Sequence, residues 1–214
     1  IRNQGPIGRR HIASQTGTSE RVTRGELDVL REQGLIQSSS LGMQLTPEGE
    51  RTFLTLQAVV REFYNLEHLE QKLAPLLGVK KLIIVPGDAD GDPSGQRDLA
   101  REAAHYLRTI LKDGDILAVS GGSTMAQVAE SFTPGDSPSN VTVVPVRGGL
   151  GEDIKIQANS VAVSLAERLG GTYRLLHAPE DVLPCNLAQI LNEPRIRSVI
   201  ALGRRANVLL HGIG

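Results

Sequence analysis

The residues best suited to hold a ligand lie in two short loops, each directly after an apolar run. Residues 121–124 read Gly-Gly-Ser-Thr and follow "DILAVS", and residues 147–149 read Arg-Gly-Gly and follow "VTVVPV". Glycine amides, hydroxyl groups and the start of a helix all favour a bound anion. A guanidinium group can hold two phosphate oxygens at once. The two loops together predict a site with two phosphate anchors.

A third loop and the start of a helix add groups suited to sugar hydroxyls. Residues 86–88, Pro-Gly-Asp, follow another apolar run, "KLIIV". Polar side chains also come soon after the Arg-Gly-Gly loop, namely Glu152, Asp153, Lys155, Gln157 and Asn159. This combination predicts a phosphorylated sugar as the ligand. The competing interpretation is that the loops are ordinary capped turns and that Arg147 is a solvated surface residue.

Five apolar runs, each bounded by Gly, Pro or Asp, are expected to form the strands that carry these loops. They lie at residues 79–87, 115–122, 140–149, 172–179 and 207–214. Helices are expected between them at about 95–112, 123–132, 153–169 and 181–202, the last broken near Pro194. This alternation predicts an open, mostly parallel Rossmann-like α/β sheet. Ligands of such sheets collect outside the carboxyl ends of the strands.

Residues 1–52 predict a winged helix-turn-helix, the helix, turn, helix and hairpin arrangement of many DNA-binding domains. Two helices split at Gly17, with Thr18 and Ser19 suited to cap the second. In that second helix the buried face is expected to hold Val22, Val29 and Leu30. The usual first helix of such a domain has no room before Ile1, so the chain is expected to start late.

Several side chains of these two helices are candidates for DNA contacts. Arginines would hold phosphates, and polar side chains of the second helix would reach base edges in the major groove. Arginines on a small helical domain also serve simply as solubilising charge. The candidate DNA-binding residues are Arg9, Arg10, Ser19, Glu20, Arg21, Thr23 and Arg24.

Residues 53–76 predict a linker helix between the winged helix and the effector-binding domain, which is expected over residues 77–214. An apolar stripe along this helix holds Leu56, Val59, Phe63, Leu66 and Leu73. One interpretation is that the stripe lies on the next domain. The other is a self-pairing coiled coil, although the seam spans fewer than three heptads.

Composition bounds the class of protein. The chain has 214 residues with 40% hydrophobic and 22% charged residues, which is ordinary for a soluble globular protein. A net charge of −1 excludes a globally polybasic nucleic-acid binder but leaves room for a local basic face. Cys185 is the only cysteine, and no apolar run is long enough to span a membrane. A cytoplasmic protein without metal or cofactor is expected.

The longest distinctive stretch resembles a known class of regulators. "VPVRGGLGEDIKIQANSVAVSLAERLGGTYRLLHAP", with "SGGSTMAQVAESFTP" before it and "VLLHGIG" after it, closely resembles the SorC/DeoR class of bacterial transcriptional repressors, in its glycolytic branch. "GRRHIASQTGTSERVTRGELDVLREQGLI" resembles the winged-helix domain of that class. The resemblance covers essentially the whole chain. It is specific, because "RGGLGED" followed by "QAN" is far rarer than a generic glycine loop.

The resemblance implies a repressor of glycolytic genes whose operator affinity falls when fructose-1,6-bisphosphate or another glycolytic sugar phosphate binds. It further implies a fold similar to sugar-phosphate isomerases, and a homo-oligomer, a dimer or a tetramer, on operator DNA. By position, residues 122–124 would hold one phosphate, Arg147 would clamp phosphate, and Gln157 would face the sugar. The candidate effector-binding residues are Gly122, Ser123, Thr124, Arg147, Gly148, Gly149, Glu152 and Gln157.

Two departures from the class matter. Its Gly-Thr-Thr is Gly-Ser-Thr at residues 122–124, which keeps the hydroxyl and removes a methyl group. The class also continues beyond the position of Gly214, so the effector-binding domain is expected to be incomplete here, and further effector contacts would lie outside this chain.

Two other functions stay open at this point. A sugar-phosphate isomerase or deaminase of the same fold would need a carboxylate general base, for which Glu152, Asp153 and Asp88 are available. No acid/base pair stands out by spacing, and the winged helix argues against an enzyme. The other alternative is a DNA-binding or oligomerising module that has lost its ligand.

Overall fold

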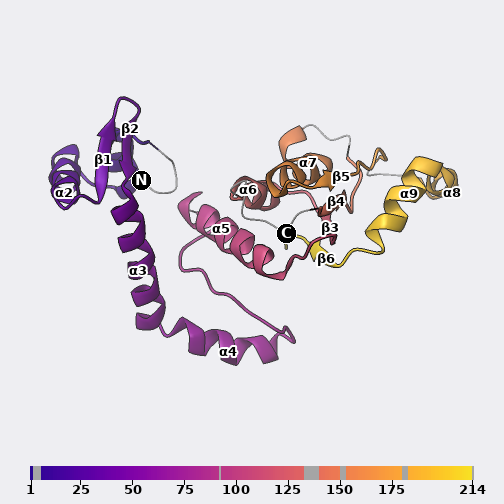
Figure 1. Ribbon diagram of the computed structural model, residues 1–214, viewed down its shortest axis with the longest axis horizontal. Coiled ribbons are helices and arrows are strands. Elements are labelled where there is room, and N and C mark those ends of the chain that lie inside the picture. The colour runs from indigo at the N-terminus through magenta and orange to yellow at the C-terminus, as the bar shows by residue number, and fades with distance from the viewer. Residues whose placement is uncertain (2–5, 92, 133–139, 150–152, 180–182, 214) are drawn as a thin grey trace. The chain divides into compact units, whose positions relative to one another are not determined.

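The computed structural model describes residues 1, 6–91, 93–132, 140–149, 153–179 and 183–213. The chain divides into two compact units, Ile1–Ile84 and Val85–Gly214. Figure 1 shows both units, with most of their helices and strands labelled. Each unit is described by itself.

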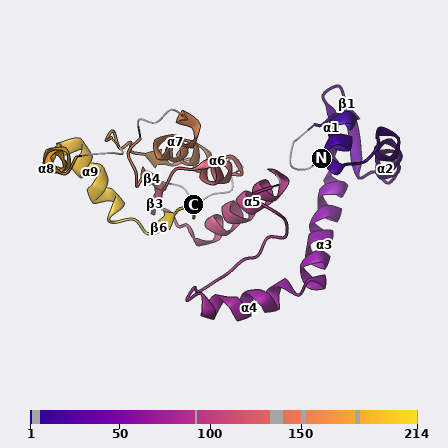
Figure 2. The ribbon, with the colours of Figure 1, turned by 180° about the vertical axis from the view of Figure 1, so that it is seen from behind.

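Two helices and a hairpin open the N-terminal unit, and this order confirms the predicted winged helix-turn-helix. The side chain of Ser19 accepts a hydrogen bond from the Val22 amide, so the predicted cap of the second helix is confirmed. The two helices and the hairpin lie together in Figure 2. Their bounds are α1 Arg9–Thr16, α2 Glu20–Glu32, β1 Ile36–Ser39 and β2 Gly42–Leu45.

The hairpin and α2 share a small apolar core. Its buried members are Leu27, Ile36 and Met43, and partly buried side chains pack against them. The strands pair antiparallel, with Ile36 opposite Leu45. Ile7 and Met43 exchange two backbone hydrogen bonds of 3.0 and 2.9 Å, which tie the start of the chain to the hairpin.

The face of α2 that packs on this core differs from the predicted one. Val22 and Val29 are 45% and 49% exposed, so the prediction that they are buried is wrong. Thr23 and Leu27 are buried instead, each at 4% exposure. The reason is helical spacing: residues 23, 27 and 30 share one face, and the hydroxyl of Thr23 is satisfied by Thr18 at 2.8 Å.

The helix expected over residues 53–76 is two helices, α3 Pro47–Phe63 and α4 Leu66–Leu76. They separate at Asn65, whose φ of 51° lies in the left-handed region that asparagine tolerates better than most residues. The helix also starts earlier than expected, because the Thr46 hydroxyl caps it at the Gly49 amide. The domain boundaries stay a prediction.

The apolar stripe of the linker is divided by this break. Leu56, Val59 and Phe63 are exposed on α3, whereas Leu66 is buried at the start of α4. That the next domain or a second copy of the chain covers these three exposed side chains stays a prediction.

The partly buried carboxylate of Glu70 joins α3, α4 and the segment that follows them. Arg61 donates to Glu70 at 2.7 Å and to the Ile84 carbonyl at 2.9 Å, and the Ile84 amide donates to Glu70 at 2.7 Å. Burial alone would raise the pKa of Glu70. The hydrogen bonds from Ile84 and Arg61 outweigh burial, so the pKa lies below its ordinary value.

The strand expected over residues 79–87 is absent from the described part of this segment. The contacts of Ile84 supply the physical reason. Its amide and its carbonyl are both held by side chains from the preceding helices, so they are not available for a strand ladder at this residue.

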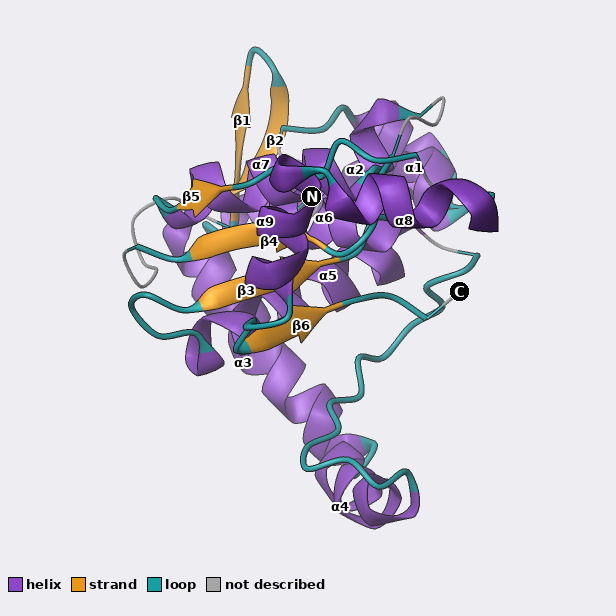
Figure 3. Cartoon of the chain, turned by 90° about the vertical axis from the view of Figure 1, so that its right-hand side faces the viewer, coloured by secondary structure: helices purple, strands orange, loops and turns teal. Residues whose placement is uncertain are grey.

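The C-terminal unit holds a parallel sheet whose strand order is β5-β4-β3-β6, as Figure 3 shows with the strands in orange. Four of the five expected strands are thus confirmed, although β5 is shorter than predicted. The strand bounds are β3 Ile116–Val119, β4 Thr142–Pro145, β5 Thr172–Tyr173 and β6 Val208–Leu210.

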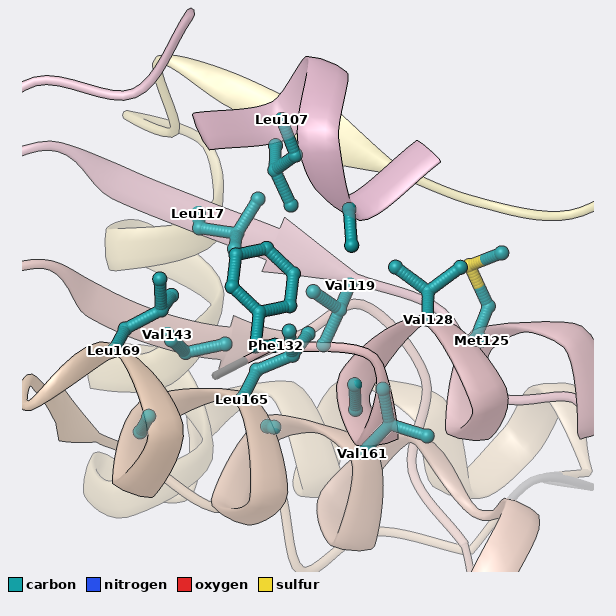
Figure 4. Close-up of a cluster of buried hydrophobic side chains, with 14 of the residues drawn as sticks. Leu107, Leu117, Val119, Met125, Val128, Phe132, Val143, Val161, Leu165 and Leu169 are labelled. Atoms are coloured by element: carbon teal, nitrogen blue, oxygen red, sulfur yellow. The ribbon is translucent and has the colours of Figure 1, made fainter. Parts of the chain in front are cut away.

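Helices cover both faces of this sheet, as expected for an open α/β fold. Leu117, Val119 and Val143 point to the face covered by α5, α6 and α7, where Leu165 joins the same buried cluster (Figure 4). Val144 points to the opposite face, on which α9 packs. The helix bounds are α5 Pro93–Ile110, α6 Ser123–Glu130, α7 Ala158–Leu169, α8 Pro184–Asn192 and α9 Pro194–Gly203.

The predicted break near Pro194 is confirmed, because Glu193 ends α8 and caps α9. A short 3-10 turn, η2 Ile154–Ile156, precedes α7. Among the described residues, no helix combines the length and apolar character that crossing a bilayer requires.

Candidate effector site and DNA-binding surface

The loop after β3 lies directly against the segment that leads into α7. The Gly122 amide donates to the Ile156 carbonyl at 2.7 Å. A methyl group added at Gly121 would lie 2.6 Å from the same carbonyl oxygen and 2.9 Å from the Ala158 nitrogen. Only glycine fits this close backbone approach, so Gly121 has a packing role that the sequence did not reveal.

The loop after β4 meets the same segment through a side chain. A methyl group added at Gly149 would lie 3.1 Å from Oε1 of Gln157. Gln157 is also the N-cap residue of α7, and its backbone packs beside Gly121. The structure therefore brings together three of the predicted site residues, Gly122, Gly149 and Gln157, at the carboxyl edge of the sheet.

The start of α6 presents backbone amides at this edge. Gly122 is the N-cap residue of α6, and its φ of 121° is a conformation that favours glycine. Its own amide is taken by Ile156, so the prediction that both glycines expose amides is wrong for Gly122. The amides of Ser123 and Thr124 follow in the first turn, where a helix offers no backbone acceptor. Ser123 is exposed and Thr124 is half-buried.

Arg147 follows the neighbouring strand and is exposed. Strands β3 and β4 are paired in parallel, with Val119 opposite Pro145. The Val146 amide continues the ladder by donating to the Val119 carbonyl at 2.9 Å. Arg147 and the start of α6 therefore lie at the same edge of the sheet, one strand apart.

A second arginine at this edge was missed in the sequence. Arg174 comes directly after β5, is exposed, and extends the pairing through its amide to the Val143 carbonyl at 3.0 Å. Its place beside a strand end was the available signal. The run "TYRLLHAP" was interpreted only as a strand.

The polar residues predicted to meet sugar hydroxyls mostly have structural partners. Asn159 donates to the Leu176 carbonyl at 3.1 Å and accepts from the Leu176 amide at 2.9 Å. Asp153 accepts from the Lys155 amide, and Asp88 accepts from the Asp90 amide within its own loop. Glu152 lies outside the described residues.

Gly148 packs closely against the backbone of Ala178. Its replacement tests this packing. A methyl group added there would overlap the Ala178 carbonyl oxygen. We expect Gly148→Ala to destabilise the C-terminal unit by about 1–3 kcal/mol, since backbone must move to admit it. Thermal unfolding measures this. Gly212→Ala is the control, because a methyl group at Gly212 meets no described residue within 4 Å. Equal melting temperatures for the two variants would contradict the described packing.

The N-terminal unit shows which predicted DNA-binding residues are accessible. Arg9, Arg10, Glu20, Arg21 and Arg24 are all exposed. Thr23 is buried and hydrogen-bonded to Thr18, so its prediction as a base-reading residue is wrong. Ser19 is exposed, but its hydroxyl caps α2.

Carboxylates oppose two of these arginines. Arg10 lies 3.6 Å from Glu20, and Arg24 lies 3.8 Å from Asp28. Both pairs are largely exposed and contribute little stability, so their arginines stay available to a phosphate.

Comparison with known proteins decides the family. The family model described as "CggR N-terminal DNA binding domain" matches residues 1–60, and the one described as "Putative sugar-binding domain" matches residues 61–214. A similar solved structure is described as a SorC family transcriptional regulator. The chain belongs to the SorC family. Membership of this family favours a regulator over the enzyme alternative, as the sequence predicted.

Two curated relatives are similar along the whole chain. The "Central glycolytic genes regulator" of Bacillus subtilis is 39% identical and that of Priestia megaterium 37% identical, each over 100% of this chain. The chain spans 63% of the length of each relative.

Solved SorC-family structures agree with the fold. A regulator from Enterococcus faecalis is 34% identical with a TM-score of 0.60, over 69% of this chain and 60% of that one. The full-length sorbitol operon regulator SorC from Klebsiella pneumoniae has a TM-score of 0.59 over 91% of this chain and 58% of that one. At 18% identity it supports the fold alone.

Proposed function

We propose that the protein is a repressor of glycolytic genes whose affinity for operator DNA falls when a phosphorylated sugar binds the C-terminal unit. The names of the two curated relatives support the glycolytic role. The observation that carries the sensing role is the convergence of Gly122, Gly149 and Gln157 at the carboxyl edge of the sheet. A DNA-binding regulator works where the chromosome lies, so we place it in the cytoplasm.

Fructose-1,6-bisphosphate is the effector that we propose, with other glycolytic sugar phosphates as alternatives of the same chemistry. The first-turn amides of α6 suit one phosphate, through their direction and the helix dipole. Arg147, one strand away, suits a second through its guanidinium. Gln157 lies between the two loops and offers an amide to a sugar hydroxyl or phosphate oxygen.

The regulatory step follows from linkage. A ligand lowers operator affinity only if it binds the DNA-free protein more tightly than the DNA-bound protein. The coupling is reciprocal, so operator DNA must lower the affinity for the effector by the same factor. The proposed dimer or tetramer would pass the change from the C-terminal units to paired winged helices. The exposed apolar side chains on α3 offer one surface for such pairing.

A gel-retardation titration tests the proposed function. The protein is titrated onto promoter DNA of the glycolytic genes, with fructose-1,6-bisphosphate absent and present. We expect the bisphosphate to weaken binding by about 5- to 150-fold, the usual range of coupling between two sites. Unphosphorylated fructose is the matched control and is expected to have no effect, because it cannot engage either phosphate anchor.

The outcomes separate the alternatives. Retardation that is unchanged over a wide range of bisphosphate concentrations would favour a DNA-binding module that has lost its ligand. Absence of retardation in any condition would contradict the DNA-binding role itself.

A further inference from the structure

A glycine lies in the middle of α2, where helices favour almost any other residue. Gly25 is the sixth residue of the 13-residue helix Glu20–Glu32. Only proline is less favourable than glycine in a helix interior, because glycine has the largest backbone freedom to lose. A structural or functional reason for Gly25 is therefore needed.

The N-terminal unit itself supplies no such reason. Gly25 is exposed, and a methyl group added there would meet nothing within 4 Å among the described residues. Its φ is also not among the positive values found in the described chain, so no strained conformation requires glycine. Alanine would fit this position in the isolated unit, which places the reason outside it.

Gly25 faces away from the core of the unit. The buried side chains of α2 are Thr23 and Leu27, on the opposite side of the helix. On the outer side Gly25 is flanked one turn away by the exposed side chains of Val22 and Val29. The missing side chain leaves a low point between two accessible apolar groups.

One arginine near this low point is placed to meet an anionic partner. Arg21, one turn before Gly25, has no carboxylate partner among the residues that the structure describes. Asp28, one turn after, lies 2.9 Å from Arg31 and 3.8 Å from Arg24. Arg24 and Arg31 offset the negative charge of Asp28, and the exposed Glu32 lies two turns after Gly25 on the same face. The feature of this face that suits a phosphate is therefore the single guanidinium group of Arg21.

We propose that Gly25 is the point of closest approach between α2 and the major groove of a DNA duplex. The absent side chain lets the helix axis move nearer to the base edges. Arg21 then reaches a phosphate or a guanine, and Val22 can contact the methyl group of a thymine. The inference rests on the proposed function of the N-terminal unit and adds the helix face, the depth of approach and the residues that set them.

Gly25→Ala is an informative variant because its two effects have opposite directions. Alanine favours the helix, so the melting temperature of the protein is expected to rise by a few degrees. The added methyl group pushes the helix out of the groove, so operator affinity is expected to fall at least about tenfold. A misfolded variant would lose both, so loss of binding in a more stable protein identifies a direct contact.

The test compares the full chain with three variants by fluorescence anisotropy on promoter DNA, with melting temperatures from the same samples. Gly25→Leu is expected to bind more weakly than Gly25→Ala. The control variant Gly212→Ala is expected to bind like the unchanged protein. Gly212 lies in the other unit, and a methyl group there also meets nothing within 4 Å in the described part of the chain.

Three results would overturn the inference. If Gly25→Ala binds DNA as tightly as the unchanged protein, the proposed close approach is contradicted and the proposed function still stands. If Gly25→Ala keeps its DNA affinity but forms a smaller assembly in ultracentrifugation, the outer face of α2 contacts a second copy of the chain instead. Absence of DNA binding by the unchanged protein overturns the proposed function, and the inference with it.

Discussion

Replacing Arg147 with alanine is expected to abolish the stabilisation that fructose-1,6-bisphosphate gives to the protein. A ligand present at about 100 times its dissociation constant adds roughly 2.7 kcal/mol to the free energy of unfolding. Arg147 is an exposed residue directly before Gly148 and Gly149, one strand from the first turn of α6. Without it, one proposed phosphate anchor is lost.

Differential scanning fluorimetry with and without the bisphosphate measures this effect. Arg205→Ala is the matched control, because Arg205 is exposed and precedes β6, at the amino edge of the sheet. The control is expected to keep the full ligand-induced rise in melting temperature. A rise of equal size in Arg147→Ala would place the phosphate elsewhere, with Arg174 the next arginine to replace.

Leu165→Ala is expected to lower the free energy of unfolding of the C-terminal unit by about 2–5 kcal/mol. Leu165 is 0% exposed and lies in α7, within the buried cluster of Figure 4 that includes Phe132 and Val143. Truncation removes apolar contacts and leaves a cavity that close-packed neighbours fill only in part. Gln157 is the N-cap residue of the same helix, so a less stable α7 is also expected to weaken the candidate site.

Urea unfolding followed by circular dichroism checks this expectation. Glu167→Ala, an exposed residue of the same helix, is the control and is expected to change stability by less than about 0.5 kcal/mol. Similar curves for Leu165→Ala and Glu167→Ala would contradict the described core.

The sheet of the C-terminal unit was predictable because its strands are short apolar runs with clear boundaries. "DILAVS" and "VTVVPV" became β3 and β4, and their adjacency places the two polar loops at one edge. The run at residues 79–87 carries the same signal but has no strand. Ile84 is instead hydrogen-bonded to Glu70 and Arg61, which lie 14 and 23 positions away in the sequence. Contacts over such separations cannot be predicted from a local sequence pattern.

The details of the candidate site needed the structure. The sequence identified Gly122, Gly149 and Gln157, and topology explains why they meet. It could not show that the Gly122 amide is taken by Ile156, because that bond depends on where the turn before α7 lies. The burial of Thr23 was similarly hidden, since threonine suits both a base contact and a satisfied interior position.

The paired hydrogen bonds of Asn159 have a mechanical consequence. They fasten the beginning of α7 to Leu176, which lies with Val199 in the apolar cluster beneath α9. A displacement of the first turn of α7 must therefore either break both hydrogen bonds or displace Leu176 as well. The side-chain amide of Asn159 therefore links α7, on one face of the sheet, to the apolar cluster on the other face.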